Sequence, residues 1–471
     1  MNCFVHFYNI MAELIRVILD QADENFFDRY SAISEARNRE LETEIKDEFP
    51  ELMAEGHMKE IRNETYFDEN FFTRMRQYSQ KALSEKQLQL LVSLLTKLDQ
   101  GLSAHLRLFQ SEQEIQGLNA NIEQTQVQLL PRRDSYWEHT SRGKNHKNDM
   151  NVYLRYAYCI DLNRTGNYKI FHRFLSPSVF SDAVHRRRLR IGMSPVTFGA
   201  QLSWNTKEVN GTGYFYITDL RGKDIIQSNC LSIWERAVKE EVDILVFPEM
   251  LGYPGLTKAF QEKMSVFPEF GQAYPALTIL PSIWMNERNT AIMLDEQGDI
   301  ILKQNKQHSF PYCQRGQNRL FLEGIRPDHE IHVLHCQGIG RMVIAVCRDA
   351  LITEYMSLLL NIIKSTLLII PSFSTGSYDF GEMIDGCRTA DCCVCWINTC
   401  SAYQLLQEDL EQKVQIWESD KLEEIGMFLR TGRRSMLKNG RHACKRSSMG
   451  CCGQDSDLCR SCLFIQDVEF A

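Results

Sequence analysis

The chain has 471 residues, of which 44% are hydrophobic and 24% charged. This is the composition of a globular protein, and the length suits two or three domains. The formal net charge of -8 excludes nucleic-acid binding through a generally basic surface, because phosphates are neutralised by clustered Lys and Arg. The longest apolar stretch, "LLLNIIKSTLLII", is interrupted by Lys364 and is too short on either side to cross a membrane.

The N-terminal stretch "MNCFVHFYNIMAELIRV" lacks the basic region, apolar core and cleavage site of a secretory signal. We therefore expect a cytoplasmic protein. In that compartment the 16 cysteines are expected to be reduced thiols and not a disulfide framework.

Residues 1–130 are expected to form a mainly helical region. In "SEKQLQLLVSLLTKLDQGLSAHLRLF" apolar residues recur at three- and four-residue spacing along one helix face. They are Leu88, Leu91, Leu95, Leu98, Leu102 and Phe109. Ser84 with Gln87 resembles a capping box that opens this helix, and Pro131 lies beyond its expected end. Two interpretations are open: a packing module, which the stripe favours, or a helix that binds a protein partner or a second copy.

Residues 131–187 are expected to form a linker and mixed segment, because this stretch is polar, basic and aperiodic. It ends in the basic cluster "HRRRLR", residues 185–190. This cluster is interpreted as a solvated face before a strand, with a phosphate contact as the weaker alternative.

Residues 188–471 have the pattern of an α/β domain. Short apolar runs alternate with helical stretches such as "CLSIWERAVKE" and "ITEYMSLLLNIIK". The runs are "LRIGMSPV", "VDILVFPE", "TAIMLD", "MVIAVC", "TLLIIPSF" and "CCVCWINTC". Because several are apolar on both faces, we expect a sheet that is covered on both sides.

Three of these strands are followed by residues that form a coherent catalytic set. Glu249 follows "VDILVFP", Lys306 follows "GDIILKQN", and Cys347 ends "MVIAVC". A thiol becomes a nucleophile when a base or a positive field helps to remove its proton. A glutamate in an apolar pocket acts as a base near neutral pH, and a lysine stabilises an oxyanion. Polar residues at strand ends occur in any α/β domain, so spacing alone does not establish the set.

Further motifs follow in a recognisable order. "VFPEMLGYPG" is followed by "RNTAIML" and "GDIILKQNKQH", then by "VCRDA", "IIPSF", "CRTADCCVCWINTCSA" and "CLFIQDVEF". In this order they resemble the nitrilase, or carbon–nitrogen hydrolase, family, whose catalytic residues are Glu, Lys and Cys. The resemblance covers residues 188–471. It implies a four-layer α-β-β-α sandwich that forms a homo-oligomer and needs no metal or organic cofactor.

The resemblance also implies a role for each residue of the set. Glu249 would be the general base, Lys306 would stabilise the tetrahedral intermediate, and Cys347 would carry the covalent intermediate. The backbone N–H of Arg348 would complete the oxyanion hole. The side chain of Arg348 has two open interpretations, an anion-binding residue for the substrate or a surface arginine in an ordinary ion pair.

Two positions bear on the kind of hydrolase. Members of the family commonly have a second glutamate after the lysine, and here Gln314 stands near the expected place with Glu323 later. Glu323 is therefore the candidate second glutamate, or the site lacks one. Asp349, two residues after the cysteine, favours an amide- or carbamoyl-hydrolysing branch over true nitrilases. His308 is expected to be a structural part of the lysine motif.

The remaining cysteines have simpler interpretations. Those between Cys387 and Cys400 are expected to be small core residues. Near the C-terminus, "HACKRSSMGCCGQDSDLCRSC" contains weak candidates for a zinc site, namely Cys444, Cys459 and Cys462. Because a zinc ribbon has two C-x-x-C pairs and this stretch has one, reduced thiols in a loop are favoured.

Two functional hypotheses follow. The first is a thiol hydrolase that cleaves non-peptide C–N bonds of a small amide-type substrate, with the N-terminal helices as a partner or oligomer module. The second is a nitrilase-like domain that has lost turnover and serves as an assembly module of a multi-component system. The presence of Glu249, Lys306 and Cys347 together favours the enzyme.

Overall fold

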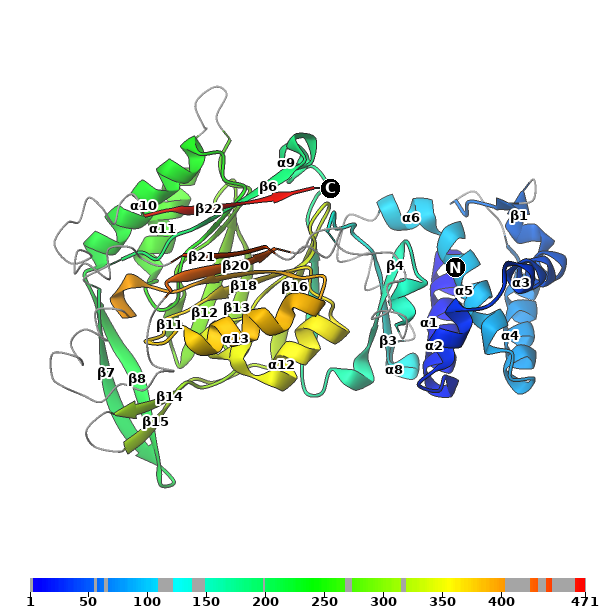
Figure 1. The fold of residues 1–471 in the computed structure, drawn as a ribbon, viewed down its shortest axis with the longest axis horizontal. Helices are drawn as coiled ribbons and strands as arrows, with labels where there is room; N and C mark the ends of the chain where they lie inside the picture. The colour runs from blue at the N-terminus through cyan, green and yellow to red at the C-terminus, as the bar shows by residue number, and fades with distance from the viewer. Residues whose placement is uncertain are drawn as a thin grey trace. The chain divides into compact units, whose positions relative to one another are not determined.

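The computed structural model of the chain is shown in Figure 1. It describes residues 3–54, 57–62, 67–108, 122–137, 149–197, 200–266, 273–314, 319–402, 424–430, 438–442 and 462–470. The chain divides into two compact units. The first contains Met1–Asp134 and His139–Gly166, and the second contains Ser135–Glu138 and Asn167–Ala471.

The first unit combines helices with two short antiparallel strand pairs. Its helices are α1 (Cys3–Gln21), α2 (Phe26–Ser31), α3 (Glu35–Glu48), α4 (Glu69–Ser84), α5 (Leu88–Gly101), α6 (Ser103–Leu108) and α8 (Ile122–Thr125). Its strand pairs are β1 (Met53–Ala54) with β2 (His57–Met58), and β3 (Val127–Pro131) with β4 (Ala157–Asp161).

Helix α5 lies at the centre of this unit. The expected stripe is buried at Leu91, Leu95, Leu98 and Leu102, whereas Phe109 lies outside the described residues. The capping box at Ser84 is a wrong prediction, because Ser84 is the last residue of α4 and its hydroxyl donates to the Lys81 carbonyl at 2.7 Å. A left-handed turn at Lys86 separates the two helices, so α5 begins at Leu88 without a side-chain cap.

The segment 131–187 is divided between the units, which differs from the expected linker. Its first part joins the first unit, since the buried Asp99 carboxylate accepts hydrogen bonds from the backbone N–H groups of Arg155 and Ala157, both at 2.7 Å. Its later part contains β5 (Lys169–Phe174), which pairs in parallel with β16 (Glu330–Cys336) of the second unit. A buried histidine, His172, and exposed basic residues in β5 hide the alternation that predicts a strand.

The described part of the second unit contains two seven-stranded sheets. The first has the order β11-β12-β10-β9-β6-β22, with β13 also paired to β12. Its strands are β6 (Arg188–Met193), β9 (Ile244–Val246), β10 (Leu277–Ile279), β11 (Ile283–Met285), β12 (Arg288–Asp295), β13 (Ile300–Asn305) and β22 (Phe464–Glu469). Strands β6, β9 and β12 form where the apolar runs predict them, whereas β10 and β11 were not predicted.

The second sheet has the order β21-β20-β19-β18-β17-β16-β5. Its remaining strands are β17 (Gly340–Ile344), β18 (Leu367–Pro371), β19 (Cys393–Ile397), β20 (Gly426–Arg430) and β21 (Lys438–His442). Strands β17, β18 and β19 run parallel and are buried along their whole length. The expected α/β architecture with a buried sheet is therefore present in this unit.

Helices cover the sheets of this unit. They are α9 (Ser181–Arg186), α10 (Lys223–Lys239), α11 (Pro254–Met264), α12 (Thr353–Ser357) and α13 (Tyr378–Gly386). The apolar side chains of α10 and α11 share a core with β9 and β12, including Trp234, Phe260 and Leu294. On the second sheet, Phe380 of α13 stacks on Trp396 of β19 with ring centroids 5.0 Å apart. Apolar burial of this kind holds helices on a sheet.

A third, four-stranded sheet has the order β14-β15-β8-β7. Strands β7 (Gln201–Val209) and β8 (Thr212–Arg221) form a long hairpin, drawn in green in Figure 1. The antiparallel strands β14 (Pro311–Gln314) and β15 (Arg319–Glu323) add to the β8 side. This small sheet carries Glu323 at the end of β15.

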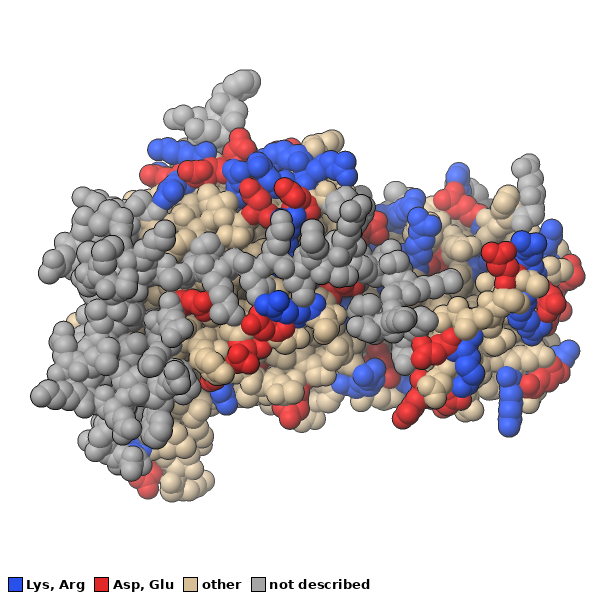
Figure 2. Space-filling model, viewed as in Figure 1, with Lys and Arg blue, Asp and Glu red and all other residues tan. Residues whose placement is uncertain are grey.

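The basic cluster at residues 185–190 is balanced by acidic side chains. Arg186 pairs with Asp243 at 2.6 Å, and Arg190 pairs with Asp467 at 3.0 Å. Figure 2 shows blue and red side chains interleaved on this part of the surface. Among the described residues, no helix is long and apolar enough to cross a membrane.

Candidate active site

Glu249 lies where the two large sheets of the second unit meet. It follows β9, and its backbone N–H donates to the Ser372 carbonyl beyond β18 at 3.3 Å. Its side chain is completely buried. One carboxylate oxygen, Oε2, accepts the backbone N–H of Phe373 at 2.7 Å. The carboxylate is thus held by groups from both sheets.

Lys306 directly follows β13 and is also buried. Its ammonium group, Nζ, lies 2.8 Å from Glu249 Oε1 and 2.7 Å from Glu323 Oε2. An ammonium has three N–H donors. Two are taken by these carboxylates, and no protein acceptor for the third is found among the described residues. One N–H of the Lys306 ammonium is therefore left to donate to a ligand.

Asn289 of β12 links the two carboxylates. Its Nδ2 donates to Glu249 Oε1 at 2.7 Å and lies 3.4 Å from Glu323 Oε1. Its Oδ1 accepts the hydroxyl of Ser282 at 2.6 Å, and this hydroxyl accepts the backbone N–H of Met250 at 2.9 Å. This orientation of the Asn289 amide fits the network and the flipped one does not, since its oxygen meets a hydroxyl donor and its nitrogen meets carboxylate acceptors.

Cys347 stands at a sharp turn after β17. Its φ of 49° is left-handed, which costs a residue other than glycine on the order of 1–2 kcal/mol. A short 3-10 helix, Cys347–Leu351, begins at this residue. The nucleophiles of α/β hydrolases occupy similarly strained strand-to-helix turns that present the reactive atom. The turn thus separates Cys347 from the buried strand that precedes it.

The charges of this cluster influence one another. Burial raises the pKa of the Cys347 thiol, the Glu249 carboxylate raises it further, and the Lys306 ammonium lowers it. Burial also raises the pKa of Glu249, with Lys306 opposing and Glu323 adding to the shift. The pKa of Lys306 is raised, because its carboxylate neighbours outweigh the loss of hydration. The Glu249 carboxylate and the Cys347 thiol thus influence each other's pKa, so a proton acceptor lies near the thiol.

Asp349 lies two residues beyond Cys347 and is fully buried. Its Oδ1 accepts the backbone N–H of His308 at 2.8 Å and faces His308 Nδ1 at 2.9 Å. His308 is thus attached to the cysteine turn, in keeping with a structural place in the lysine motif.

The structure brings Glu249, Lys306, Glu323 and Cys347 into one buried cluster. Arg348 follows Cys347 in the turn and is half-buried. No ion pair of its side chain is found among the described residues. Gln314 lies in β14, and its side chain is outside the described residues.

Three parts of the site were not assigned by sequence reasoning. They are the Asn289 amide, the backbone N–H of Phe373, and the Asp349 carboxylate as an acceptor of backbone N–H groups. The only available signals were a buried asparagine beginning the "RNTAIML" strand and an aspartate beside the cysteine. Neither reveals its partner, because the partners lie in other strands.

The cysteines outside the cluster divide into two groups. Cys387, Cys392, Cys393, Cys395 and Cys400 are buried, as expected of core thiols. Of the zinc candidates, Cys444 and Cys459 lie outside the described residues, and Cys462 lies two residues before β22 begins. Within the described ranges, no three His, Cys, Asp or Glu side chains come together as a metal site.

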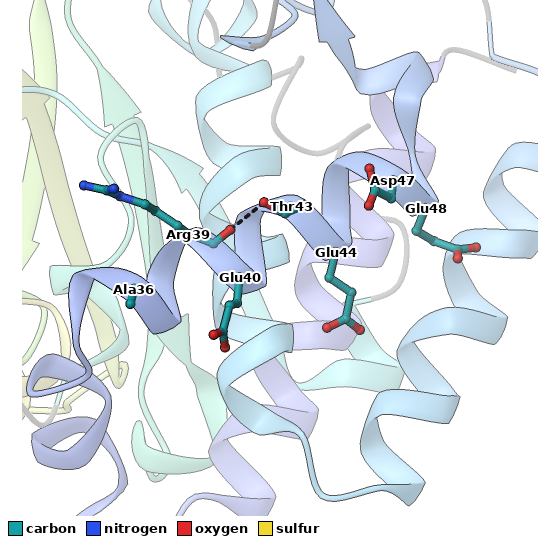
Figure 3. A pocket seen from close by; sticks show the side chains of 7 residues that line it. All are labelled: Ala36, Arg39, Glu40, Thr43, Glu44, Asp47 and Glu48. Carbon is teal, nitrogen blue, oxygen red and sulfur yellow. Dashed lines mark hydrogen bonds between the residues drawn. The ribbon is translucent and has the colours of Figure 1, made fainter.

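A surface hollow in the first unit is formed by α3 alone. Figure 3 shows Glu40 and Glu44 pointing the same way from the helix, with Asp47 and Glu48 at its end. Its lining residues are Ala36, Arg39, Glu40, Thr43, Glu44, Asp47 and Glu48. It contains none of the residues of the buried cluster, so it is a feature of the helix surface and not part of the candidate site.

No family model and no curated protein matches the sequence. Solved structures superpose on part of the chain. A mutant amidase from Nesterenkonia sp. AN1 is 12% identical, with a TM-score of 0.35, and the match covers 60% of this chain and 93% of that one. The NitFhit protein of C. elegans is 16% identical, with a TM-score of 0.34 and coverage of 56% and 62%.

A carbon-nitrogen hydrolase from Helicobacter pylori G27 is 12% identical, with a TM-score of 0.36, and the match covers 61% of this chain and 90% of that one. The identity with all three proteins is too low to transfer a substrate to this chain.

Proposed function

We propose that the second unit is a thiol hydrolase of the nitrilase type that cleaves non-peptide C–N bonds. The observation that carries this proposal is the Lys306 ammonium between the buried carboxylates of Glu249 and Glu323, beside the Cys347 thiol. A nucleophile, a base and an oxyanion donor are the groups that acyl transfer requires. The two large sheets would form the inner layers of the α-β-β-α sandwich.

In the acylation step, Glu249 removes the proton of the Cys347 thiol as sulfur attacks the carbonyl carbon of the substrate. The carbonyl π electrons move to oxygen, where the third N–H of Lys306 and the backbone N–H of Arg348 stabilise the negative charge. The carbonyl then re-forms, the C–N bond breaks, and protonated Glu249 gives its proton to the leaving nitrogen. The products are a thioester on Cys347 and an amine or ammonia.

In the second step, water adds to the thioester. Glu249 takes a proton from the water, the resulting hydroxide oxygen bonds to the acyl carbon, and the C–S bond breaks. The proton on Glu249 returns to the Cys347 sulfur, which restores the thiol and releases a carboxylic acid. The net reaction consumes one amide and one water, and neither step requires a metal or an organic cofactor.

The substrate is a small amide or carbamoyl compound in this proposal. Asp349 supports this choice over a nitrile, through the resemblance of "VCRDA" to the amide-hydrolysing branch. Arg348, which is half-buried and follows Cys347 in the chain, suits a substrate that also carries a carboxylate or phosphate.

Alkylation of the thiol by iodoacetamide, followed by peptide mass spectrometry, tests the assembled site. We expect Cys347 to react faster than the buried thiols of the sheet core, and Glu249→Gln and Lys306→Ala to slow this reaction. Cys395→Ala, which removes an equally buried thiol from β19, is the control and should leave the rate unchanged. Fast labelling would then justify a screen of small amides for release of ammonia or amine.

If Cys347 reacts no faster than Cys395 and no amide is turned over, the hydrolase proposal fails. The alternative of a catalytically inactive assembly module would then become the working hypothesis, and the N-terminal helices would be the region in which to look for a partner.

A further inference from the structure

The Asp349 carboxylate connects two segments that carry the nucleophile and the lysine. Its Oδ2 accepts the backbone N–H of Val346 at 3.2 Å, within the cysteine turn. Across the site, its Oδ1 and Oδ2 lie 3.0 and 3.1 Å from the backbone nitrogen of Gln307. Its Oδ1 also accepts from the His308 backbone at 2.8 Å. One buried carboxylate therefore holds residues on both sides of the gap between the segments.

This placement restrains both reacting groups. Lys306 directly precedes Gln307, and its own backbone N–H donates to the Asn289 carbonyl at 2.8 Å. Its main chain is consequently held on the upstream side by β12 and on the downstream side by Asp349. Cys347 stands between Val346 and Asp349 in a strained left-handed conformation. The hydrogen bond that the Asp349 side chain accepts from the Val346 N–H in this turn offsets that strain.

Asp349 is itself oriented by a series of hydrogen bonds between side chains. His308 Nδ1 lies 2.9 Å from Asp349 Oδ1, and His308 Nε2 lies 3.2 Å from the Tyr168 hydroxyl. The ring nitrogen Nδ1 thus faces the carboxylate, and Nε2 faces the Tyr168 hydroxyl. The Tyr355 ring packs edge-on against His308, with centroids 5.2 Å apart.

We infer that Asp349 is a positioning residue that fixes the Lys306 ammonium relative to the Cys347 sulfur, and that His308 and Tyr168 hold it in place. This inference rests on the proposed hydrolase function. Asp349 contacts neither reacting atom, and it acts by setting their separation. Displacement of a reacting group by about 1 Å lowers a rate on the order of a hundredfold.

The test measures the iodoacetamide labelling rate of Cys347 over a pH series in the full-length protein. The charged groups that face the thiol are Glu249 and Lys306. In Asp349→Asn, the new amide N–H meets backbone N–H donors, so the two segments separate and the ammonium moves away from the thiolate. We expect the labelling rate to fall by about tenfold or more and the midpoint of the pH profile to rise.

Asp243→Asn is the matched control. Asp243 is another largely buried carboxylate of the second unit, and it accepts the Arg190 backbone N–H at 2.8 Å away from the cluster. Its loss should lower stability but leave the midpoint of the labelling profile unchanged. If Asp349→Asn labels with the rate and midpoint of the wild type, the inference is overturned.

Should Asp349→Asn fail to fold, Tyr168→Phe decides the question, since it removes only one hydroxyl from the chain of hydrogen bonds. We expect it to lower the labelling rate by about fivefold, the effect of roughly one hydrogen bond. A folded Tyr168→Phe protein with a wild-type profile would overturn the inference. Slow labelling of wild-type Cys347 without turnover would instead count against the proposed function, and this result requires no Asp349 variant.

Discussion

Glu323 Oε2 lies 2.7 Å from Lys306 Nζ, although the two residues are positioned by different sheets of the second unit. Lys306 follows β13 of a seven-stranded sheet, whereas Glu323 ends β15 of the four-stranded sheet. The register of β15 on β8 places Glu323 opposite Phe215, and the Gly324 N–H donates to the Phe215 carbonyl at 2.8 Å. The β7–β8 hairpin therefore supports a carboxylate of the proposed site.

Glu323→Gln should change both the rate and its pH dependence. The negative charge of Glu323 raises the pKa of Glu249, so its neutralisation lowers that pKa and moves the acid limb of kcat/KM to lower pH. The plateau should fall by about tenfold to a hundredfold, because Lys306 loses a charged hydrogen-bond acceptor. Glu208→Gln, which breaks an exposed ion pair on the same small sheet, is the control. An acid limb that moves to higher pH would contradict this electrostatic account.

Gly324→Ala should disturb the position of Glu323. A Cβ atom at Gly324 would lie 2.3 Å from a ring carbon of Tyr216 on β8, so the end of β15 has to shift. We expect kcat/KM to fall by about tenfold or more, and the double variant with Tyr216→Ala to recover part of the loss. Gly386→Ala, where nothing lies within 4 Å of the added atom, is the control. Equal activity of the single and double variants would show that the contact has no role in the rate.

Asn289→Asp is expected to act in the opposite direction to Glu323→Gln. It places a further carboxylate at the position that now donates to Glu249 at 2.7 Å. The added negative charge should raise the pKa of Glu249 and move the acid limb of kcat/KM to higher pH. Asn229→Asp, at a buried amide of α10 away from the cluster, is the comparison variant. The prediction is wrong if both Asn289→Asp and Glu323→Gln move the limb in the same direction.

His172 should make stability depend on pH. Its Nδ1 lies 2.9 Å from His335 Nε2, and burial lowers its pKa from 6.5 to about 3. Between these values the unfolded chain binds a proton that the folded chain does not. The free energy of unfolding should therefore fall by about 1.4 kcal/mol per unit as pH decreases through this range.

Urea unfolding at a series of pH values measures this dependence. His172→Gln should flatten the slope by about 1.4 kcal/mol per pH unit, since it removes the titrating group. The exposed His185→Gln variant on α9 should keep the wild-type slope. A wild-type slope in His172→Gln would assign the pH dependence to other groups.

Several β strands of the second unit were predictable because their signal is local. Runs such as "VDILVFPE" and "TLLIIPSF" combine β-branched and apolar residues on both faces, and they form β9 and β18. Strand β5 was missed because His172 fills an inward position. A histidine reads as polar in a sequence, and its pairing with His335 depends on a strand 163 residues away.

In the first unit the sequence predicted the body of a helix better than its first and last residues. The stripe that contains Leu91, Leu95 and Leu98 predicted a buried helix, and α5 contains it. The start of this helix was wrong, because a serine followed by glutamine fits both a helix start and the exposed last turn of α4. A short capping pattern does not show whether its first residue ends one helix or begins the next.

The sequence by itself determined several strands of the second unit, among them β9, β13 and β17, and that Glu249, Lys306 and Cys347 each follow one of these, since such features depend on neighbouring residues along the chain. Tertiary structure alone decided that Glu323 lies against Lys306, that Asn289 donates to Glu249, and that Asp349 joins the two turns. These contacts connect different strands and sheets. Their geometry depends on strand register and sheet packing, which are set by the whole core and leave no local pattern in the sequence.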